Sequence, residues 1–407
     1  MSNLEQLDLF GAIQKVYGED GQVSNERLYQ RLSEVTGVDP SVWSQKAPVG
    51  KSGQEHSMAR RKVRWFQQTL KKLGLIEKVD GKRGVWRAAM GCKKDLTPAP
   101  EETFLVAFST KLGLAIWGRC ESVFPAIDEP IHLMISSPPY PLRNPRAYGN
   151  PTVAQYIDFI CESLEPIVKN LVEGGSICLN VSNDIFEQGR PARSMYQERL
   201  LIALNDRLGL SKMDQFIWHN PTKAPGPIQW ASKKRYQLNV SYEPIYWLTN
   251  CPEKVRSDNR RVLQPHSEAQ LKLIASGGEK RNGVYGDGAN RIKEGSFSNA
   301  TGGKIPRNLF TVAHRCAKQG PAKKALKDAG LAAHSACMPF TVADFLVKFM
   351  TEPGDLVVDP FGGLFTTAHA AQANGRRWIS TEMNHEYAWA GAHRFSNEEG
   401  FDIALSV

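Results

Sequence analysis

The stretch DLVVDPFGGLFTTAHAA (355–371) has the pattern of a strand, a turn and a helix. Its apolar run ends at Asp359, a turn with Gly362 and Gly363 follows, and we predict a helix from residue 366. Open α/β sheets bind ligands at the carboxyl ends of strands, where small residues let a cofactor approach the backbone. The stretch therefore predicts a cofactor-binding turn, with glycines that only turn the chain as the alternative.

A second predicted strand, RWIST (377–381), ends beside Glu382. An acid at this place can accept hydrogen bonds from the ribose hydroxyls of a nucleotide-like cofactor. A nicotinamide dinucleotide and S-adenosylmethionine both carry such a ribose, so these two motifs alone do not distinguish between the two cofactors.

Strands and helices alternate from about residue 104 onward. The predicted strands are FLVAF (104–108), LAIWG (114–118), IHLMI (131–135), SICLNV (176–181), QFIWH (215–219), EPIYWL (243–248), DLVVD (355–359) and RWIST (377–381). The predicted helices cover residues 153–172, 195–208, 340–351, 366 onward and 385–395. This order is typical of the α/β class with a mostly parallel sheet.

The first 95 residues predict a small separate unit. Two helices, the second capped by Ser24, precede a third over 57–73, and two short strands flank an Asp80–Gly81 turn. This order resembles a winged helix, whose third helix enters the major groove and whose wing contacts phosphate. The alternative is a helical cap or dimerisation unit whose charges are only solvated. The predicted DNA contacts are Arg60, Arg61, Arg64, Lys82 and Arg83.

Positive charge is concentrated in two segments. The formal net charge is +9; residues 59–94 hold 12 Lys and Arg against 2 acids, and residues 251–330 hold 16 against 7. Two separate basic segments predict contact with a polyanion such as nucleic acid. Basic faces that only keep the protein soluble are the alternative.

The stretch IHLMISSPPY (131–140) combines a buried-type strand with a stiff loop. Pro138 and Pro139 have a fixed φ and no N–H, so the loop would present carbonyl oxygens as acceptors. The exocyclic amine of a nucleobase is a poor nucleophile because its lone pair is delocalised into the ring. The Ser137 hydroxyl and the Pro138 carbonyl could hold the amine hydrogens out of the ring plane, and Tyr140 could stack on an extruded base. A strand simply stopped by two prolines is the alternative without chemistry.

The motifs SSPPY (136–140) and DPFGG (359–363), in this order and separated by a basic polar segment, resemble those of the β class of DNA amino-methyltransferases. The resemblance covers roughly residues 110–395. It implies a Rossmann-like methyltransferase sheet, S-adenosyl-L-methionine as cofactor and double-stranded DNA as partner. Because the SPPY form is commonest in members that modify cytosine N4, the expected reaction is methyl transfer to the N4 amine of a cytosine flipped out of duplex DNA.

The resemblance also implies roles for single residues. Ser137, Pro138, Pro139 and Tyr140 would form the catalytic loop. Met338 and Phe365 depart from the family pattern, in which Lys or Phe is common at the first position and Gly at the second. The expected cofactor-binding residues are His334, Ala336, Met338, Asp359, Phe361, Gly362, Gly363 and Glu382.

The predicted organisation has four parts joined in part by a linker over residues 93–103. These are a winged-helix-like DNA-binding unit (1–95), a catalytic part with SPPY (104–250), a target-recognition region (251–330) and a cofactor-binding part (331–407). Arginine suits bidentate guanine recognition, although phosphate contacts are commoner. The candidate DNA contacts in the target-recognition region are Arg256, Arg260, Arg261, Lys280, Arg281 and Arg291.

Other functions fit these motifs less well. Adenine-N6 methylation needs the same amine geometry and stays open, as does an inactive DNA-binding regulator. Cytosine-C5 methylation typically uses a cysteine after a proline, and the chain has no Pro-Cys dipeptide. Enzymes that methylate a protein glutamine through a PPY loop place the cofactor motif first, and a nicotinamide dehydrogenase would leave SPPY without a role.

Composition and sequence patterns limit the cellular location and the ligands that we expect. The N-terminal sequence lacks the pattern of a signal peptide, no run of 18 apolar residues occurs, and the seven cysteines show no zinc-ligand spacing. We therefore expect a cytoplasmic protein of bacterial or phage origin with reduced thiols, no metal and no membrane contact. A monomer or homodimer is expected, and a cognate restriction endonuclease acting separately is a possible partner.

Overall fold

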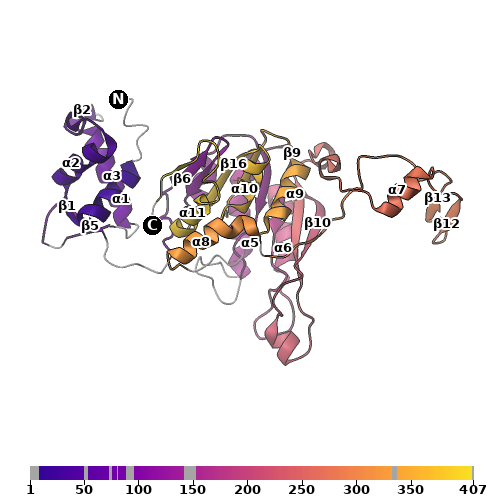
Figure 1. Ribbon diagram of the computed structural model, residues 1–407. Coiled ribbons are helices and arrows are strands. Elements are labelled where there is room, and N and C mark those ends of the chain that lie inside the picture. The colour runs from indigo at the N-terminus through magenta and orange to yellow at the C-terminus, as the bar shows by residue number, and fades with distance from the viewer. Residues whose placement is uncertain are drawn as a thin grey trace.

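The computed structural model describes residues 9–49, 54–72, 76–79, 81–88, 96–141, 153–314, 316–331 and 337–405. A large sheet flanked by helices forms the centre of the molecule (Figure 1). A small N-terminal unit lies beyond one edge of this sheet and an arm of the chain extends beyond the other edge (Figure 1). In the described residues, no helix is both long and apolar enough to cross a membrane.

The sheet has ten strands in the described part of the chain. Their order is β14 (Leu309–Thr311), β10 (Ser211–His219), β11 (Tyr242–Thr249), β9 (Leu171–Asn180), β8 (Ile131–Ser136), β15 (Leu356–Asp359), β16 (Arg377–Glu382), β7 (Gly113–Trp117), β6 (Leu105–Thr110) and β17 (Asp402–Ile403). The five central strands, from β9 to β7, are parallel. β10 and β11 form an antiparallel pair on one side, and β6 pairs antiparallel with both β7 and β17 on the other. The predicted α/β class with a mostly parallel sheet is confirmed.

Helices cover both faces of the sheet. One layer contains α4 (Cys120–Val123), α5 (Val153–Lys169) and α6 (Tyr196–Leu208), and the other contains α9 (Phe340–Met350), α10 (Thr366–Ala373) and α11 (His385–Ala392), with α8 (Gly320–Asp328) against α11. Successive side chains of a strand point to opposite faces. Met134 of β8 accordingly packs with α5 and α6, whereas Leu133 and Ile135 pack with the other layer. This two-sided burial explains why residues 131–135 are apolar without alternation.

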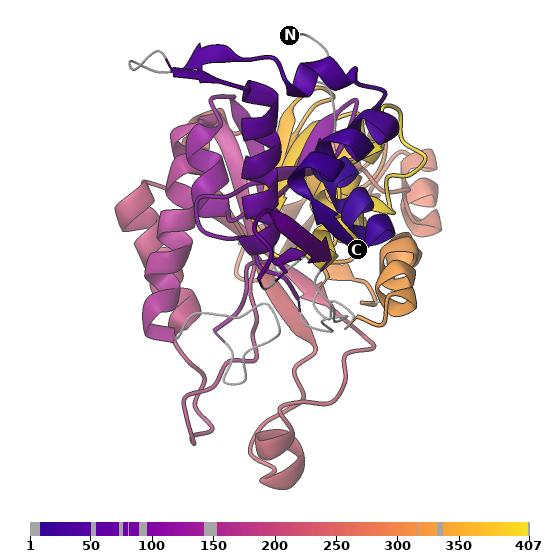
Figure 2. The same ribbon diagram turned by 90° about the vertical axis from the view of Figure 1, so that its left-hand side faces the viewer.

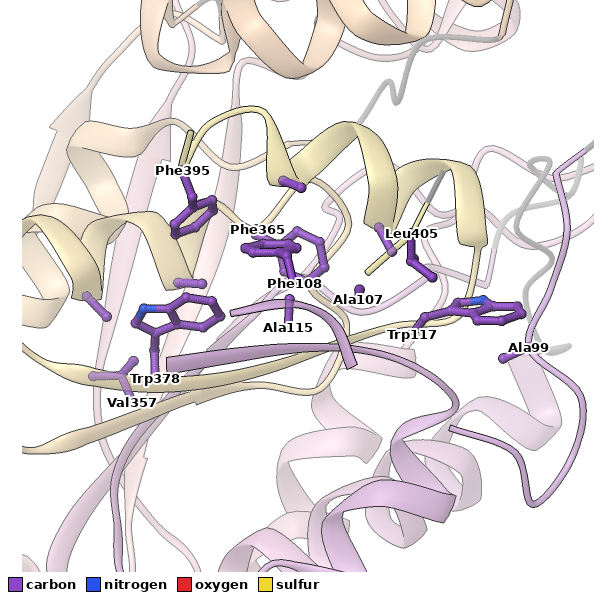
Figure 3. Close-up of a cluster of buried hydrophobic side chains, with 14 of the residues drawn as sticks. Ala99, Ala107, Phe108, Ala115, Trp117, Val357, Phe365, Trp378, Phe395 and Leu405 are labelled. Carbon is purple, nitrogen blue, oxygen red and sulfur yellow. The ribbon is translucent and has the colours of Figure 1, made fainter. Parts of the chain in front are cut away.

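Phe365 occupies a backbone conformation that favours glycine. Its φ is +56°, which costs a non-glycine residue about 1 kcal/mol. The ring is fully buried and packs edge-on against Phe108 at a centroid distance of 5.2 Å, near Trp378 and Phe395 (Figure 3). A Cβ on Gly391 would lie 2.3 Å from this ring. The aromatic cluster thus accommodates a residue that departs from the family pattern.

The described residues of the N-terminal unit form three α-helices and a three-stranded antiparallel sheet. The helices are α1 (Leu9–Asp20), α2 (Asn25–Thr36) and α3 (Met58–Lys72), and the sheet order is β1 (Gln22–Ser24), β5 (Val85–Ala88) and β4 (Ile76–Lys78). Ser24 caps α2, as predicted, by accepting a hydrogen bond from the backbone N–H of Arg27 (3.2 Å). A further hairpin of β2 (Ala47–Val49) and β3 (Gln54–His56) was not predicted.

Part of the predicted linker belongs to the central domain. The backbone N–H and the hydroxyl of Thr97 both donate to the Glu386 carboxylate at 2.7 Å, and the N–H of Ala99 donates to the Met383 carbonyl. Residues 96–99 are therefore fastened to the start of α11. The central domain begins at about residue 96 rather than 104.

The segment after β11 runs along the edge of the sheet at which the parallel strands begin. The N–H of Arg256 donates to the carbonyl of Gly174, near the start of β9, and that of Asp258 donates to Phe349 at the end of α9. The arm follows, with α7 (Glu268–Ala275), β12 (Gly283–Tyr285) and β13 (Asn290–Ile292) (Figure 1). The short helices are η1 (Pro40–Trp43), η2 (Phe124–Ala126), η3 (Ile228–Lys233), η4 (Pro252–Lys254), η5 (Asn259–Val262) and η6 (Ala317–Gln319).

Candidate active site

The two sequence motifs follow neighbouring strands at the point where the chain direction across the sheet reverses. β8 leads through α5 to β9 on one side, whereas β15 leads through α10 to β16 on the other side. Connections that diverge in this way leave a crevice at the carboxyl ends of the two strands, where α/β sheets bind ligands. The loop Ser137–Tyr140 follows β8 and the glycine turn follows β15, so both motifs reach this crevice.

Direct hydrogen bonds join the two strand ends. The Ser136 hydroxyl donates to Asp359 Oδ1 (2.6 Å), which also accepts the backbone N–H of Phe361 (3.1 Å). The Thr367 hydroxyl donates to the carbonyl of Ile135 (3.2 Å). Burial raises the pKa of Asp359 to about 6, although its hydrogen bonds act in the opposite direction. Asp359 therefore ties the catalytic loop to the glycine turn.

A cavity of about 440 Å³ opens between the motifs. This volume lies in the range of pockets that bind cofactors and drug-sized ligands. His334 and Ala336 lie outside the described residues. All the other predicted catalytic and cofactor residues line the cavity: Ser137, Pro138, Pro139, Tyr140, Met338, Asp359, Phe361, Gly362, Gly363 and Glu382.

Close contacts and backbone conformation explain why glycines occupy positions 362 and 363 of the turn. A Cβ on Gly362 would lie 2.4 Å from the Ser380 hydroxyl, and Gly363 has a φ of +54°. The N–H of Gly363 donates to Glu382 Oε2 (2.8 Å), which draws the turn against the end of β16. A larger residue would collide with Ser380 and the Phe365 ring at position 362 and would strain the backbone at position 363.

Glu382 is a buried acid held by backbone donors. Its Oε1 accepts the backbone N–H (2.7 Å) and the side-chain amide (3.0 Å) of Asn384. Within the described part of the chain, Oε2 accepts only the backbone N–H of Gly363. Burial raises the pKa of Glu382 to about 7, against the effect of these hydrogen bonds. A carboxylate oxygen can accept a further hydrogen bond, so Glu382 can bind a hydroxyl group in the cavity.

Ser137 and Tyr140 belong to a polar network that the sequence did not reveal. The Ser137 and Tyr140 hydroxyls lie 2.8 Å apart, and Asn180 Nδ2 donates to both (3.4 and 3.3 Å) and to Glu243 Oε2 (3.3 Å). Tyr140 also donates to Glu243 Oε2 at 3.5 Å, and Lys223 Nζ lies 2.9 Å from Glu243 Oε1. Because a carboxylate only accepts, the amide nitrogen of Asn180 must face Glu243. Its Oδ1 is buried without a partner among the described residues.

Tyr140 differs from the expectation of an open stacking face. The residue is 6% exposed and packs in the core with α5 and α6. Burial holds the pKa of its hydroxyl well above the usual range. A base could therefore meet Tyr140 only from within the cavity that the residue lines.

The model of the DNA methylase family, which covers N6 and N4 amino-methyltransferases, matches residues 131–392. The chain belongs to this family. The type II methyltransferase M.PvuII of Proteus hauseri is 35% identical over 268 residues, which are 66% of this chain and 79% of that protein. The DNA adenine methyltransferase YhdJ of Escherichia coli K12 is 39% identical over only 61 residues, which are 15% of this chain and 21% of that protein.

The solved structure of the PvuII DNA methyltransferase, described as cytosine-N4-specific, matches the fold of this methylase. The TM-score is 0.57 with 30% sequence identity, over 72% of this chain and 91% of that chain. The resemblance to the β-class enzymes and the methyltransferase fold are thus confirmed. S-adenosyl-L-methionine is the cofactor and DNA the substrate of the methylase.

The cavity fits this cofactor. Glu382 can accept hydrogen bonds from a ribose, Gly362 leaves backbone free for close approach, and Phe361 and Met338 supply apolar lining. Sequence reasoning missed Arg119, which lines the cavity just after β7. It also missed Arg394, a buried guanidinium that donates to the carbonyl of Leu364 (2.5 Å) behind the glycine turn.

Arg394 lacks a carboxylate partner in the described residues. It also donates to the Thr366 hydroxyl (3.0 Å) and lies 3.1 Å from His369 Nδ1. Burial lowers the pKa of Arg394 to about 10 and that of His369 to about 3, so the methylase holds an arginine cation against a neutral imidazole at physiological pH. No local sequence pattern marks this clamp on the turn.

Three predicted DNA contacts of the methylase lie far from the cavity, at the opposite edge of the sheet. Arg256 pairs with Asp355 (3.6 Å), Arg261 pairs with Glu352 (2.7 Å), and Arg260 pairs with Asp258 (2.6 Å). Asp355 directly precedes β15, whose other end carries the glycine turn. This part of the predicted target-recognition region lies there because β11 returns the chain to the edge where the parallel strands begin.

The remaining predicted DNA contacts are distributed over the arm and the N-terminal unit. Lys280, Arg281 and Arg291 are exposed on the arm. Arg61, Arg64, Lys82 and Arg83 are exposed on α3 and on the turn between β4 and β5. Arg60 instead donates to the Trp43 carbonyl (2.9 Å), stacks on the Tyr29 ring and pairs with Glu26, so it serves the fold of the unit.

Proposed function

We propose that the protein transfers a methyl group from S-adenosyl-L-methionine to the exocyclic N4 amine of a cytosine that is flipped out of duplex DNA. One observation carries the proposal: the loop Ser137–Tyr140 and the turn Phe361–Gly363 line the same cavity. The likeness to a cytosine-N4-specific enzyme supports the choice of base.

Four residues prepare the amine in this proposal. The cofactor, when bound, supplies the methyl group. The Ser137 hydroxyl and the Pro138 carbonyl accept the two amine hydrogens and draw the nitrogen lone pair out of conjugation with the ring. The stiff Pro138–Pro139 peptide holds these acceptors in place before reaction, so little reorganisation is needed. Asn180 Nδ2 donates to the Ser137 hydroxyl (3.4 Å) and so orients that acceptor.

The polar network supplies a path for the proton. As the carbon–nitrogen bond forms and the carbon–sulfur bond breaks, the amine must release one proton. It passes to Ser137 Oγ while the Ser137 proton passes to the Tyr140 oxygen and the Tyr140 proton passes to Glu243, along contacts of 2.8 and 3.5 Å. Catalytic hydrogen bonds of free enzymes are often long and shorten in the reacting complex. Lys223 pairs with Glu243 (2.9 Å) at the end of this path.

Adenine N6 is the second candidate target, favoured by the short match to a DNA adenine methyltransferase. Incubating the full-length protein with labelled S-adenosyl-L-methionine and unmodified DNA, followed by nucleoside analysis, separates the two. We expect N4-methylcytosine and loss of labelling in a Ser137→Ala variant. N6-methyladenine would select the alternative, and tight DNA binding without any transfer would identify an inactive regulator.

The N-terminal unit is proposed to be a winged helix that binds DNA next to the target. Arg61, Arg64, Trp65 and Lys71 share the exposed side of α3, while Val63, Gln67 and Leu70 face the core of the unit. Deleting residues 1–95 leaves the fastened residues 96–99 in place. The deletion should weaken DNA binding and flatten its salt dependence; an unchanged slope would indicate a dimerisation or partner role instead.

The arm is proposed to add phosphate contacts through Lys280, Arg281 and Arg291. A restriction endonuclease of the same specificity, acting as a separate protein, is the proposed biological counterpart. Its presence would be tested by challenging DNA methylated by this protein, and unmethylated DNA, with an extract of the source cells. Cleavage of the unmethylated DNA alone is the expected result.

A further inference from the structure

The connection between β10 and β11, residues 220–241, leaves the sheet at the same edge as the cavity. β11 is antiparallel to β9 and β10 is antiparallel to β11, so β10 runs in the direction of β8. The carboxyl end of β10 and the amino end of β11 therefore lie where the parallel strands end. Figures 1 and 2 show this connection projecting from the body of the domain as a separate extension.

The extension is an ordered element with its own hydrogen bonds. The N–H of Asn220 donates to the Ser241 carbonyl and that of Val240 donates to Gly226, both at 2.8 Å, which closes the stem. Near the tip, η3 and the N–H of Tyr236, which donates to the Trp230 carbonyl (2.8 Å), form a compact turn. The stem therefore holds the tip at a defined place.

The stem is joined to the catalytic network. Lys223 near its start pairs with Glu243, the second residue of β11, at 2.9 Å. Glu243 in turn lies within 3.5 Å of the Tyr140 hydroxyl. The extension is thus anchored two contacts away from the loop that prepares the amine.

The surface of the extension combines apolar and cationic side chains. Ile228 is 61% exposed, Tyr236 is 68% exposed and Leu238 is 88% exposed. Lys233, Lys234 and Arg235 are also exposed, and residues 220–241 contain no acid. Apolar side chains on a projecting element indicate a partner surface, and the uncompensated positive charge selects a polyanion.

We propose that this extension enters the DNA duplex beside the target base. Tyr236 and Leu238 pack against the neighbouring bases and occupy the space left by the extruded base, while Lys233, Lys234 and Arg235 bind the flanking phosphates. Apolar wedges inserted at base steps and stacking of bases on aromatic rings are known ways to stabilise opened DNA. The inference rests on the proposed function, since it concerns the same flipped base.

The arm provides a matched comparison. Tyr285 is 59% exposed and Val284 is 66% exposed, so the arm also presents one aromatic and one aliphatic side chain. The arm, however, is rooted at the edge where the parallel strands begin: Asn308, just after the arm, is bonded to Asp214 near the start of β10. Residues 284–285 therefore test whether exposed apolar side chains contribute to methylation even when they do not lie at the cavity edge of the sheet.

The experiment compares full-length Y236A/L238A with full-length Y285A/V284A. The DNA probe carries the site found by sequencing, with base-modification detection, DNA from cells that express the natural protein. Single-turnover methylation is measured on this duplex and on the same duplex with the target base mispaired, because a mispaired base is extruded more easily. Melting temperature and cofactor affinity confirm that each variant folds.

We expect Y236A/L238A to methylate the paired duplex at least about 10-fold more slowly and to recover most of this loss on the mispaired duplex. The arm variant should stay within about 2-fold of the natural protein, as expected for surface changes away from the bases. An unaffected extension variant, an equal loss on both duplexes, or a loss confined to the arm variant would overturn the inference. A natural protein that methylates no DNA would instead refute the proposed function.

Discussion

Two short basic segments, residues 220–241 and residues 251–262, lie at opposite edges of the same sheet. The first contains four Lys and Arg residues without an acid, and the second contains four together with two acids. They are separated along the chain only by β11, which carries it from the cavity edge to the opposite edge. Net charge indicates that a polyanion is bound, but strand direction decides which basic segment can reach the site.

The arginines at the far edge have partners within the fold. Arg256 and Arg261 pair with Asp355 and Glu352, which flank the turn before β15. The cations of the extension are exposed, and among the described ion pairs only Lys223 at its base has an acidic partner. The comparison predicts that changes at the cavity edge alter catalysis and DNA binding, whereas changes in residues 251–262 at the far edge alter stability alone.

The largest effect is expected from Ser137→Ala at the cavity edge. Removing one of the oriented acceptors should lower kcat about 100- to 1,000-fold, as loss of a preorganised hydrogen-bonding group does in other active sites. Cofactor affinity, measured by calorimetry, should be unchanged. Ser211→Ala at the start of β10, on the far edge, is the matched control and should keep full activity; a comparable loss there would remove the distinction between the edges.

Glu243→Gln should slow methyl transfer by about 100-fold, the lower end of the usual contribution of a proton acceptor. Because a glutamine amide cannot take up the proton that the amine releases, the loss should appear in kcat, with cofactor affinity unchanged. Single-turnover methylation and calorimetry measure the two quantities.

Glu352→Gln at the far edge is the control for Glu243→Gln. It should retain the kcat of the natural protein. An unchanged kcat in Glu243→Gln would exclude the proton path.

Of the two short basic segments, only residues 220–241 should lose DNA binding when their charge is removed. Lys233→Ala/Lys234→Ala should weaken binding about 10-fold and reduce the slope of log K against log salt by about 2, because each phosphate contact contributes about 0.9 to the slope. Arg260→Ala/Arg261→Ala should leave both quantities unchanged. Fluorescence anisotropy at several salt concentrations measures the two slopes; equal slopes in both variants would contradict the assignment.

Cofactor binding should tighten several-fold as pH rises through about 7. Burial raises the pKa of Glu382 from 4.5 to about 7, so ionisation of this residue destabilises the free fold as pH rises through that window. A cofactor ribose favours the ionised acceptor and therefore binds more tightly above the folded pKa. Ionisation of Asp359, whose pKa is about 6, contributes to the same pH dependence in the lower part of this pH range. Calorimetric titrations from pH 5.5 to 8.5 test this, and Glu382→Gln should flatten the curve.

The smallest effect is expected from Arg261→Ala. Arg261 forms an ion pair with Glu352, whose side chain is largely exposed. Loss of this ion pair should therefore lower the free energy of unfolding by about 0.5–1 kcal/mol. Denaturant unfolding measures this change. A decrease in methylation rate without a change in stability would show that the far edge takes part in function after all.

Several elements of the site were predictable from local sequence. The apolar runs of β8 and β15, the turn at Gly362–Gly363 and the acid after β16 each have a pattern within a few residues. Asn180 and Glu243 were missed because they approach Tyr140 from 40 and 103 residues away along the chain. A residue with a left-handed backbone conformation is usually glycine. Phe365 is an exception, because its ring is stabilised by Phe108, which lies far away in the sequence.

By itself, the sequence determined which segments become strands and that two of them end in a proline-stiffened loop and a glycine turn. It did so because apolar periodicity and backbone restriction act over neighbouring residues. The tertiary structure alone decided that these two ends share a cavity, that Glu243 closes the polar network, and that residues 220–241 lie on the cavity side while residues 251–262 do not. Those placements follow from strand order and direction, which arise from packing between segments distant in the chain.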